Sequence, residues 1–429
     1  MLDWIVGIVV LLALIAAGVP IAFAMTAVAF AGIVALIGLY PAYAILGQVF
    51  YDNGMSYTLS VMPLFVLMGN FVLKAGLADD MYAAANAWLR HYRGGLAMAT
   101  IVACGGFSSV CGSSLATAAT MARVSMPSMR RFGYSDRLAT GSIAAGGTLG
   151  ILIPPSIVLV LYGVITQESI GKLFLAGMLP GLVGVLGYLI AVRISLLIEK
   201  EHTERLEPLP MMERVRATKG VIGILALFAC VMGGIYIGVF TATEAAGVGA
   251  TGAFLLALLR RSLTLRTLYE VLIETGRMTA MLFFVLFGAL LFSNFVNLAG
   301  MPGDLRNMIM ALGAHPTMVL LVILVIYLAL GAVLESISMM LLTVPVFFPV
   351  VIGLGVDPIW FGIFVVVAIE ISLITPPVGL NVFVLKSIVP DVPTGVIFRG
   401  VMPFIAVDIV RILMLIAVPS LALLLPSTM

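Results

Sequence analysis

Charged residues are scarce in this sequence. Lys, Arg, Asp and Glu together make up 10% of its 429 residues, while hydrophobic residues make up 62%. Water-soluble proteins carry roughly 25% charged residues, and no single soluble core could bury so much apolar surface. Because a helix of about 20 residues spans a bilayer, the chain has room for ten or more spans. The scarcity of charge therefore excludes a water-soluble protein and predicts an all-α polytopic membrane protein.

Cysteine and histidine are also rare, with three of each. Their spacing indicates neither a disulfide framework nor a transition-metal site, and HExxH and Gly-x-Ser-x-Gly motifs are absent. The run Gly171-Lys172-Leu173 lacks the other residues of a phosphate-binding loop. A basic stripe with interleaved aromatic residues is missing too. We therefore expect no enzyme activity, no nucleotide and no nucleic-acid partner.

Long apolar runs are what the sequence has instead. Ten of them predict full spans. The first, within Met1 to Pro20, lacks the positively charged leader of a secretory signal peptide, so we expect it to be retained as a span. Two further stretches, 95–127 and 316–352, have a polar or small-residue break in the middle and predict re-entrant hairpins. The predicted full spans are 2–18, 20–40, 56–76, 137–166, 172–198, 220–239, 242–259, 277–299, 358–388 and 401–425.

Positively charged clusters predict the orientation, because Lys and Arg near span ends stay in the cytoplasm. Placing all the clusters inside requires both termini to lie outside the cell membrane. The hydrophilic segment 199–219 becomes a cytoplasmic linker, and the poorly charged links 41–55, 167–171 and 240–243 fall outside. Three amphipathic segments, 77–93, 262–275 and 301–315, are expected along the membrane interface.

An internal repeat with an offset of 222 residues relates the two halves. It matches Pro154-Pro155 with Pro376-Pro377 and Gly133 with Gly355. Each half then holds five spans and one hairpin, and because five is odd the halves have opposite orientations. Such inverted repeats are typical of secondary transporters. The first half, 1–198, comprises scaffold spans 1–76, arm 77–93, hairpin 95–127, broken span 137–166 and span 172–198; the second, 220–425, comprises scaffold spans 220–299, arm 301–315, hairpin 316–352, broken span 358–388 and span 401–425.

The breaks in these helices are the predicted binding site. Proline removes an N–H and frees carbonyl oxygens, which together with Ser and Thr hydroxyls suit a hard cation such as sodium. Helix N-termini at the breaks favour a carboxylate on the substrate. The alternative is that these small residues only allow close helix packing. The predicted cation ligands are Ser113, Ser114, Thr117, Gly147, Thr148 and Pro154 in the first half, and Glu335, Ser336, Ser338, Thr343, Thr375, Pro376 and Gly379 in the second.

Ionised residues within the membrane are costly and often functional. Glu335 and Glu370 could be cation ligands or hinge partners, although for Glu370 we favour a helix-end acid facing a water-filled cavity. Asp408 and Arg411 are three residues apart, which allows a structural ion pair on one helix face. Arg123 is expected to extend to the cytoplasm.

Several runs resemble the large (M) membrane subunit of tripartite ATP-independent periplasmic (TRAP) transporters. The resemblance covers essentially the whole chain, and its most specific part is the first-half run. The residues that carry it are Gly105-Gly106-Phe107-Ser108-Ser109, Gly112 to Thr117, Arg131 to Tyr134, Gly146 to Ser156, Leu334-Glu335-Ser336 and Ile374 to Asn381.

This resemblance implies sodium-driven uptake of a small organic anion by an elevator-type movement. It also implies two partners, a periplasmic substrate-binding protein and a small four-helix membrane subunit. The expected substrate contacts lie in the same runs, at Ser108, Ser109, Pro155, Ser156 and Asn381. One alternative is a single-component sodium/organic-anion symporter, and another is a membrane enzyme or channel-like scaffold. Sialic acids, C4-dicarboxylates, other sugar acids and small sulfonates all remain open as substrates.

Overall fold

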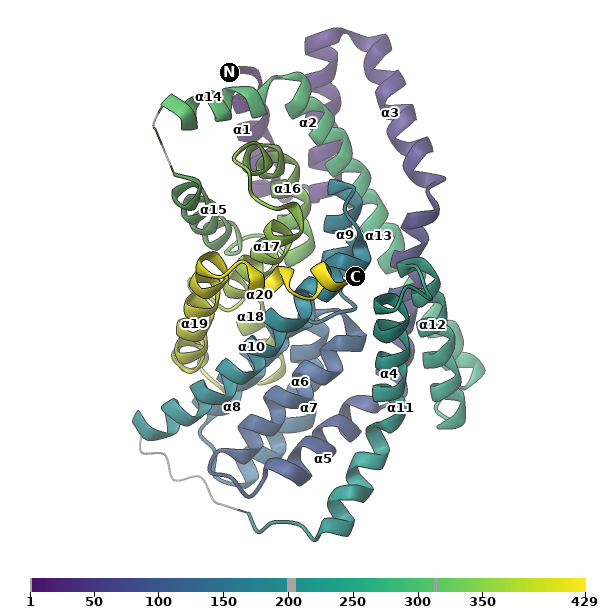
Figure 1. Cartoon of the computed structure of the whole chain (residues 1–429), viewed down its shortest axis with the longest axis vertical. Coiled ribbons are helices and arrows are strands. Elements are labelled where there is room, and N and C mark those ends of the chain that lie inside the picture. The colour runs from purple at the N-terminus through teal and green to yellow at the C-terminus, as the bar shows by residue number, and fades with distance from the viewer. Residues whose placement is uncertain (1, 199–205, 312, 314) are drawn as a thin grey trace.

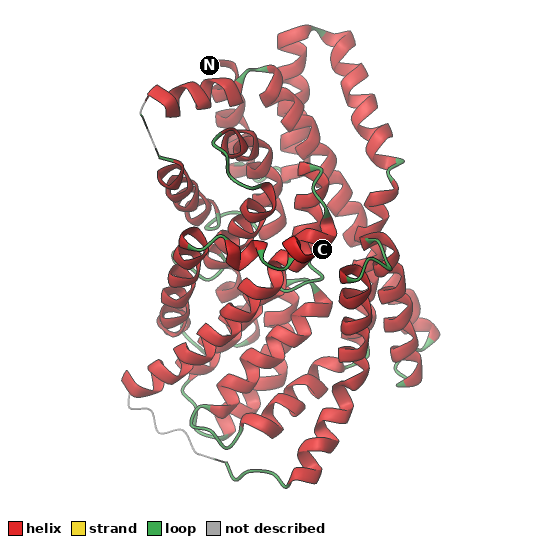
Figure 2. Cartoon of the chain, viewed as in Figure 1, coloured by secondary structure: helices red, strands yellow, loops and turns green. Residues whose placement is uncertain are grey.

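A computed structural model describes residues 2–198, 206–311, 313 and 315–429, and all regular structure in these ranges is helical (Figure 2). Seven of the described helices are long and apolar enough to cross a membrane, and six shorter apolar helices accompany them. The prediction of an all-helical polytopic membrane protein is therefore confirmed. The number of ten full spans stays a prediction, because several apolar runs are divided into shorter helices.

In the first half, short helices outnumber long ones because the chain is interrupted at Gly, Ser and Pro. The elements are α1 Leu2–Ala16, α2 Ile21–Ile37, α3 Leu39–Gly54, η1 Tyr57–Ser60, α4 Val61–Lys74, α5 Leu77–Leu89, α6 Gly95–Cys111, α7 Ser114–Arg131, α8 Asp136–Thr148, η2 Leu149–Ile151, α9 Ile157–Thr166 and α10 Ile170–Ile198.

The second half contains longer scaffold helices and the same kind of interruptions. Its elements are α11 Met211–Tyr236, α12 Ala242–Leu259, α13 Leu265–Leu298, α14 Met301–Ala311, α15 Pro316–Leu330, α16 Ser336–Gly353, α17 Pro358–Ser372, α18 Leu380–Ile388, α19 Thr394–Ala417, α20 Ser420–Leu423 and η3 Pro426–Thr428.

Three segments differ from the sequence-based expectation. Most of the link 41–55 is the helix α3, because Pro41 falls in its first turn, where a missing N–H costs nothing. The segment 262–275 is not a separate interfacial helix: Thr264 accepts a hydrogen bond from the N–H of Thr267, and α13 then continues through the membrane run. The linker 199–219 is helical from Met211, and its residues 199–205 lie outside the described part of the chain.

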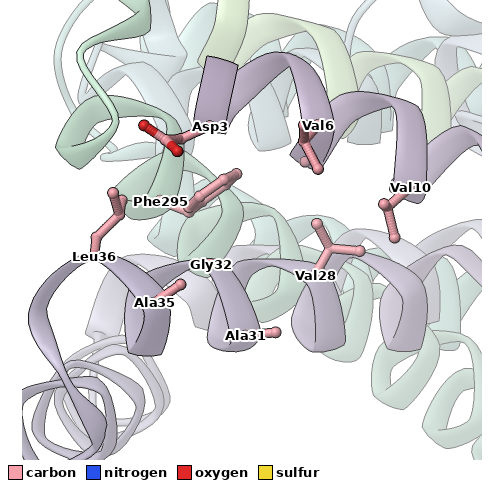
Figure 3. A pocket seen from close by; sticks show the side chains of 10 residues that line it. Asp3, Val6, Val10, Val28, Ala31, Gly32, Ala35, Leu36 and Phe295 are labelled. Carbon is pink, nitrogen blue, oxygen red and sulfur yellow. The ribbon is translucent and has the colours of Figure 1, made fainter. Parts of the chain in front are cut away.

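The scaffold helices pack closely through small residues. Gly7 on α1 and Gly32 on α2 both face the ring of Phe295 from α13, and a Cβ at either glycine would collide with that ring. Figure 3 shows Phe295 beside Gly32 at one end of an apolar groove between α1 and α2, with Asp3 nearby. The groove has a volume of about 280 Å³ and lies apart from every predicted ligand.

The two predicted hairpins enter the molecule from opposite ends (Figure 1). Helices α14 to α16 lie at the end that holds the N-terminus, whereas α5 to α8 lie at the opposite end. Between them, every residue of α17 from Ile359 to Ser372 is buried, as expected for a helix that is apolar on all sides except for Glu370 and Ser372 near its end. This arrangement is what an inverted repeat needs, although the repeat itself stays a prediction.

Candidate transport site

A turn of two residues, Gly112 and Ser113, separates α6 from α7, and we call it the first tip. Gly112 has a φ of 64°, which glycine adopts without strain, and its N–H donates to the carbonyl oxygen of Ser108 over 2.9 Å. The Ser113 hydroxyl accepts a hydrogen bond from the N–H of Ala116 over 3.4 Å and caps α7. The first tip thus ends one helix and exposes the N-terminal N–H groups of the next.

The segment from Leu149 to Ser156 separates α8 from α9, and we call it the first break. Pro154 and Pro155 cannot donate backbone hydrogen bonds, so the helix does not continue through them. The Ser156 hydroxyl donates to the carbonyl oxygen of Ile151 over 2.5 Å and accepts from the N–H of Leu159 over 3.3 Å, so it caps α9. Its hydrogen bonds are therefore used within the break.

The first tip and the first break are in contact. A Cβ on Gly147 would lie 3.2 Å from the Cα of Ala118, and one on Gly150 would lie 3.4 Å from the carbonyl oxygen of Ser113. Glycine at both positions allows the backbones to approach this closely. The structure thereby places Ser113 beside Gly150 and Gly147 beside Ala118 of α7, and the role of Ser113 and Gly147 as cation ligands stays a prediction.

In the second half, the turn Gly331–Glu335 joins α15 to α16, and we call it the second tip. Glu335 occupies the N-cap position of α16 but its carboxylate does not cap the helix. Instead, the Ser338 hydroxyl donates to Oε1 of Glu335 over 3.4 Å. A Cβ on Gly331 would lie 3.2 Å from the Cα of Ser372, so the second tip packs against the end of α17.

The second break, Leu373–Gly379, is more open than the first. Pro376 is exposed, whereas Pro154 at the matching position is buried. The Thr375 hydroxyl donates to the carbonyl oxygen of Ile371 over 2.6 Å, and Gly379, with a φ of 60°, begins α18. The Thr343 hydroxyl shares a 2.5 Å hydrogen bond with the hydroxyl of Tyr327. The two predicted cation sites thus have different surroundings despite their matching sequences.

The two tips meet at one cavity of about 60 Å³. Ser113 and Ser114 line it from the first tip, and Glu335 and Ser336 line it from the second. Apolar side chains of α9 and α13 complete the wall, so the cavity joins both hairpins to the scaffold. The N-terminal ends of α7 and α16 therefore converge on one place, which is the arrangement that stabilises a bound anionic group.

A direct hydrogen bond also joins the two halves. Nδ2 of Asn381, at the start of α18, donates to the carbonyl oxygen of Ala144 in α8 over 3.1 Å. Its Oδ1 is buried and has no hydrogen-bond partner, and neither has the buried Oγ1 of Thr117, which lies beside the thiol of Cys111. Buried, neutral oxygens with free lone pairs are suitable ligands for a hard cation, so these residues fit a sodium ion.

The predicted substrate contacts are not all gathered with Asn381. The hydroxyls of Ser108 and Ser109 donate to the carbonyl oxygens of Gly105 and Gly106 in their own helix, over 2.9 and 2.6 Å. Ser109 and Pro155 instead line a small cavity with residues of α4 and α11. Their role in substrate binding stays a prediction.

A buried ionic cluster lies beside the breaks, and only part of it was predicted. Arg411 Nη2 is 2.9 Å from Oδ1 of Asp408, which confirms the ion pair expected within α19. It also donates to Oε2 of Glu370 in α17 over 2.6 Å. The expectation that Glu370 faces a water-filled cavity is wrong, because its side chain is 0% exposed and paired with Arg411. Sequence spacing could not find this pair, since 41 residues separate the two side chains.

Tyr188 is the member of this site that sequence reasoning missed. Its hydroxyl donates to Oδ2 of Asp408 over 2.6 Å and lies 3.2 Å from the hydroxyl of Thr148, at the end of α8. Tyr188 sits in the apolar run of α10, where only its position facing α19 distinguishes it from other buried aromatic residues. Through it, the ionic cluster reaches a predicted cation ligand.

The sequence matches the family described as "Tripartite ATP-independent periplasmic transporter, DctM component" over residues 8–421. The C4-dicarboxylate TRAP transporter large permease protein DctM of Pseudomonas aeruginosa is 39% identical, with 88% of each chain covered. The sialic acid TRAP transporter large permease protein SiaM of Vibrio cholerae is 34% identical over 97% of this chain and 96% of that one. The 2,3-diketo-L-gulonate TRAP transporter large permease protein YiaN of Escherichia coli is 31% identical, with 96% of each covered.

A solved structure shares the fold. The YdaH transporter of Alcanivorax borkumensis superimposes with a TM-score of 0.64 at 14% sequence identity, covering 91% of this chain and 88% of that one. The apolar helices and the family match over most of the chain define a multi-pass transporter permease, not an enzyme. The chain belongs to the TRAP transporter family, as its DctM component, the large permease.

Proposed function

We propose that this permease carries a small organic anion into a bacterial cell, driven by a sodium gradient and supplied by a periplasmic binding protein. Family membership over residues 8–421 is the observation that carries the proposal of organic-acid uptake. Relatives are named for C4-dicarboxylates, sialic acid and 2,3-diketo-L-gulonate, all of which carry a carboxylate. The convergence of two helix N-termini on the cavity between the tips favours such an anion.

Sodium coupling is supported by the chemistry of two residues that follow the first tip and the second break, Thr117 in α7 and Asn381 in α18. The unpartnered Oγ1 of Thr117 and Oδ1 of Asn381 are neutral oxygen ligands held away from water. Sodium prefers such hard ligands, and charge need not be provided by the protein. We further propose an elevator-type movement, in which the helix pairs and the broken helices move past the scaffold helices.

The proposed partners are a small four-helix membrane subunit and a periplasmic substrate-binding protein, in an inner membrane with both termini of this chain in the periplasm. A relative from Oleidesulfovibrio alaskensis, the isethionate TRAP transporter permease protein DctMQ, is 31% identical, and the match covers 94% of this chain but 63% of that protein. Its additional length is consistent with a fused small subunit. A single-component symporter is the alternative function.

Reconstitution in proteoliposomes tests the proposal. Vesicles containing this chain and its small subunit receive a binding protein loaded with a radiolabelled carboxylic acid, under an inward sodium gradient. We expect uptake that stops when a sodium ionophore collapses the gradient, and uptake that this chain alone does not support. Unchanged uptake after collapse contradicts sodium coupling, and uptake by this chain alone favours the single-component symporter.

Variants at the breaks test the site separately. Ser114→Ala and Thr375→Ala each remove one hydroxyl while leaving most packing atoms, so we expect a weaker sodium dependence with little loss of membrane expression. Ser114 is 2% exposed and borders the cavity between the tips. A wild-type sodium response in both variants would argue against these ligands without affecting the family assignment.

A further inference from the structure

A chain of buried polar contacts leads from the ionic cluster to the end of α8. Nη2 of Arg411 lies 2.9 Å from Oδ1 of Asp408, and Oδ2 of the same carboxylate accepts the hydroxyl proton of Tyr188. The oxygen of Tyr188 is then 3.2 Å from Oγ1 of Thr148. Thr148, Tyr188 and Asp408 are each 0% exposed, so water does not interrupt this chain from outside.

The direction of each hydrogen bond in this chain follows from the pairing of Asp408 with Arg411. A carboxylate is only an acceptor, and Asp408 is held as a carboxylate by the guanidinium of Arg411. Tyr188 has one hydroxyl proton and gives it to Asp408, so towards Thr148 its oxygen can only accept. The Thr148 proton has two acceptors, the Tyr188 oxygen and the carbonyl oxygen of Ala145 at 2.8 Å. Neither choice uses the lone pairs of Thr148.

We propose that Asp408 is a positioning residue for binding of the coupling cation. By accepting the proton of Tyr188, it leaves the lone pairs of the Thr148 hydroxyl free to bind that cation. Thr148 is next to Leu149, the first residue of the first break, and a hydroxyl that received a proton from Tyr188 would have a lone pair occupied. The inference rests on the proposed sodium coupling and assigns to the ionic cluster a role in sodium binding. Arg411 and Glu370 support the cluster by holding the carboxylate of Asp408 in place.

Asp408→Asn reverses the chain of donors. The amide NH₂ cannot face the positively charged Arg411, so the amide oxygen takes that side and the NH₂ faces Tyr188. Tyr188 then accepts from the amide and gives its own proton to Thr148, which occupies a lone pair that the cation needs. Adding Tyr188→Phe removes that proton. The double variant should therefore bind sodium more tightly than Asp408→Asn alone. If the variants only damaged packing, the double variant would bind sodium less tightly than the single one.

Sodium itself is the probe. The thermal unfolding midpoint of the purified full-length chain in detergent is measured against NaCl, with choline chloride keeping the ionic strength constant, because a bound ion stabilises the folded state by mass action. We expect Asp408→Asn to raise the half-saturating sodium concentration roughly tenfold, the equivalent of about one hydrogen bond. Asp408→Asn with Tyr188→Phe should return to within about threefold of the wild type.

Two arms keep the test decisive if Asp408→Asn fails to fold. Thr148→Val should lose the sodium response and Thr148→Ser should retain it, and a wild-type response in Thr148→Val overturns the inference.

Asp52→Asn, on the exposed face of α3, controls for the loss of a carboxylate elsewhere. An unchanged sodium response in Asp408→Asn, or a double variant no better than the single one, overturns the inference alone. Absence of any sodium response in the wild type overturns the proposed coupling as well.

Discussion

Three hydroxyls beside the first tip and at the two breaks are already hydrogen-bonded within their own segment. Ser108 donates to Gly105, Ser156 to Ile151 and Thr375 to Ile371. Such bonds satisfy the proton but leave oxygen lone pairs, so a hydroxyl bonded in this way can still ligate a cation. Asn381 differs, because its amide joins the two halves and its Oδ1 is unpartnered.

Asn381→Ala should therefore have two effects. It removes a candidate sodium ligand, so the half-saturating sodium concentration should rise, and it removes the hydrogen bond from α18 to the carbonyl of Ala144, which lowers the free energy of unfolding by about 1 kcal/mol. The measurements are chemical unfolding in detergent and a sodium titration of the unfolding midpoint.

Asn294→Ala is the matched control for this change. Asn294 is exposed and donates only to the carbonyl oxygen of Leu290 in its own helix, over 2.9 Å. We expect little change in either measurement. If both variants gave the same result, the contact between Asn381 and Ala144 would have no special role.

At the scale of elements, the approach of α10 to α19 decides whether the ionic cluster can form. Gly184 of α10 lies directly against Nη1 of Arg411, and a Cβ there would collide with the guanidinium. The glycine is thus required by its neighbour in space and not by its own backbone conformation. No feature of the apolar run around it reveals this in the sequence.

Gly184→Ala should displace Arg411 from its two acids. We expect the free energy of unfolding to fall by about 1–3 kcal/mol, the usual cost of overpacking a well-packed site. Gly247→Ala in α12 is the control, because a Cβ there meets no atom within 4 Å. The control should be neutral or more stable by up to about 1 kcal/mol, since alanine favours a helix. Equal stability of the two variants would contradict this account of Gly184.

At the scale of the whole molecule, an exposed ion-pair network joins the two halves outside the long helices. Arg130, at the end of α7, is 2.7 Å from Asp136 and 2.6 Å from Asp391, which lies between α18 and α19. The hydrogen bond from Arg130 lowers the pKa of the Asp391 carboxyl below its ordinary value. The stability that this pair contributes is therefore complete above the ordinary pKa and is lost as the pH falls through the lower, folded-state pKa.

Asp391→Asn tests this link between the halves. The difference in unfolding midpoint between wild type and variant should be constant from about pH 5 to 7 and should shrink below about pH 4. High salt should shrink it too, because exposed pairs are screened. A difference that increases as the pH falls would show that Asp391 does not act through its negative charge.

The proposed elevator movement requires the first tip to slide past α4. A Cβ on Gly69 of α4 would lie 3.4 Å from the Cα of Cys111, beside the first tip, so a cysteine at position 69 would be next to Cys111. Gly69→Cys should form a disulfide with Cys111 under oxidation and abolish uptake in proteoliposomes, and a reducing agent should restore it. The variant that also carries Cys111→Ser should keep its uptake under oxidation. Full uptake by the cross-linked protein would exclude movement of the tip relative to α4.

Sequence patterns were most informative where a single residue type determines the local backbone conformation. Proline pairs and the break of polar and small residues within 95–127 predicted where helices are interrupted, because missing N–H groups and a loss of apolar periodicity act locally. The continuity of α13 through 262–275 was not predicted, since an amphipathic start and an apolar continuation are both compatible with one helix. The helical state of α3 in the link 41–55 was not predicted either, although a proline such as Pro41 is tolerated in the first turn of a helix.

The sequence by itself determined that this protein is a helical membrane protein, because scarce charge and long apolar runs leave a bilayer as the only compatible solvent. It also determined the helix interruptions and, through matching motifs, the TRAP family. Only the tertiary structure decided that the tips share a cavity and that Arg411 also pairs with Glu370. Those contacts join residues far apart in the chain. Which of these residues come into contact depends on how the helices pack, and no local sequence pattern encodes that packing.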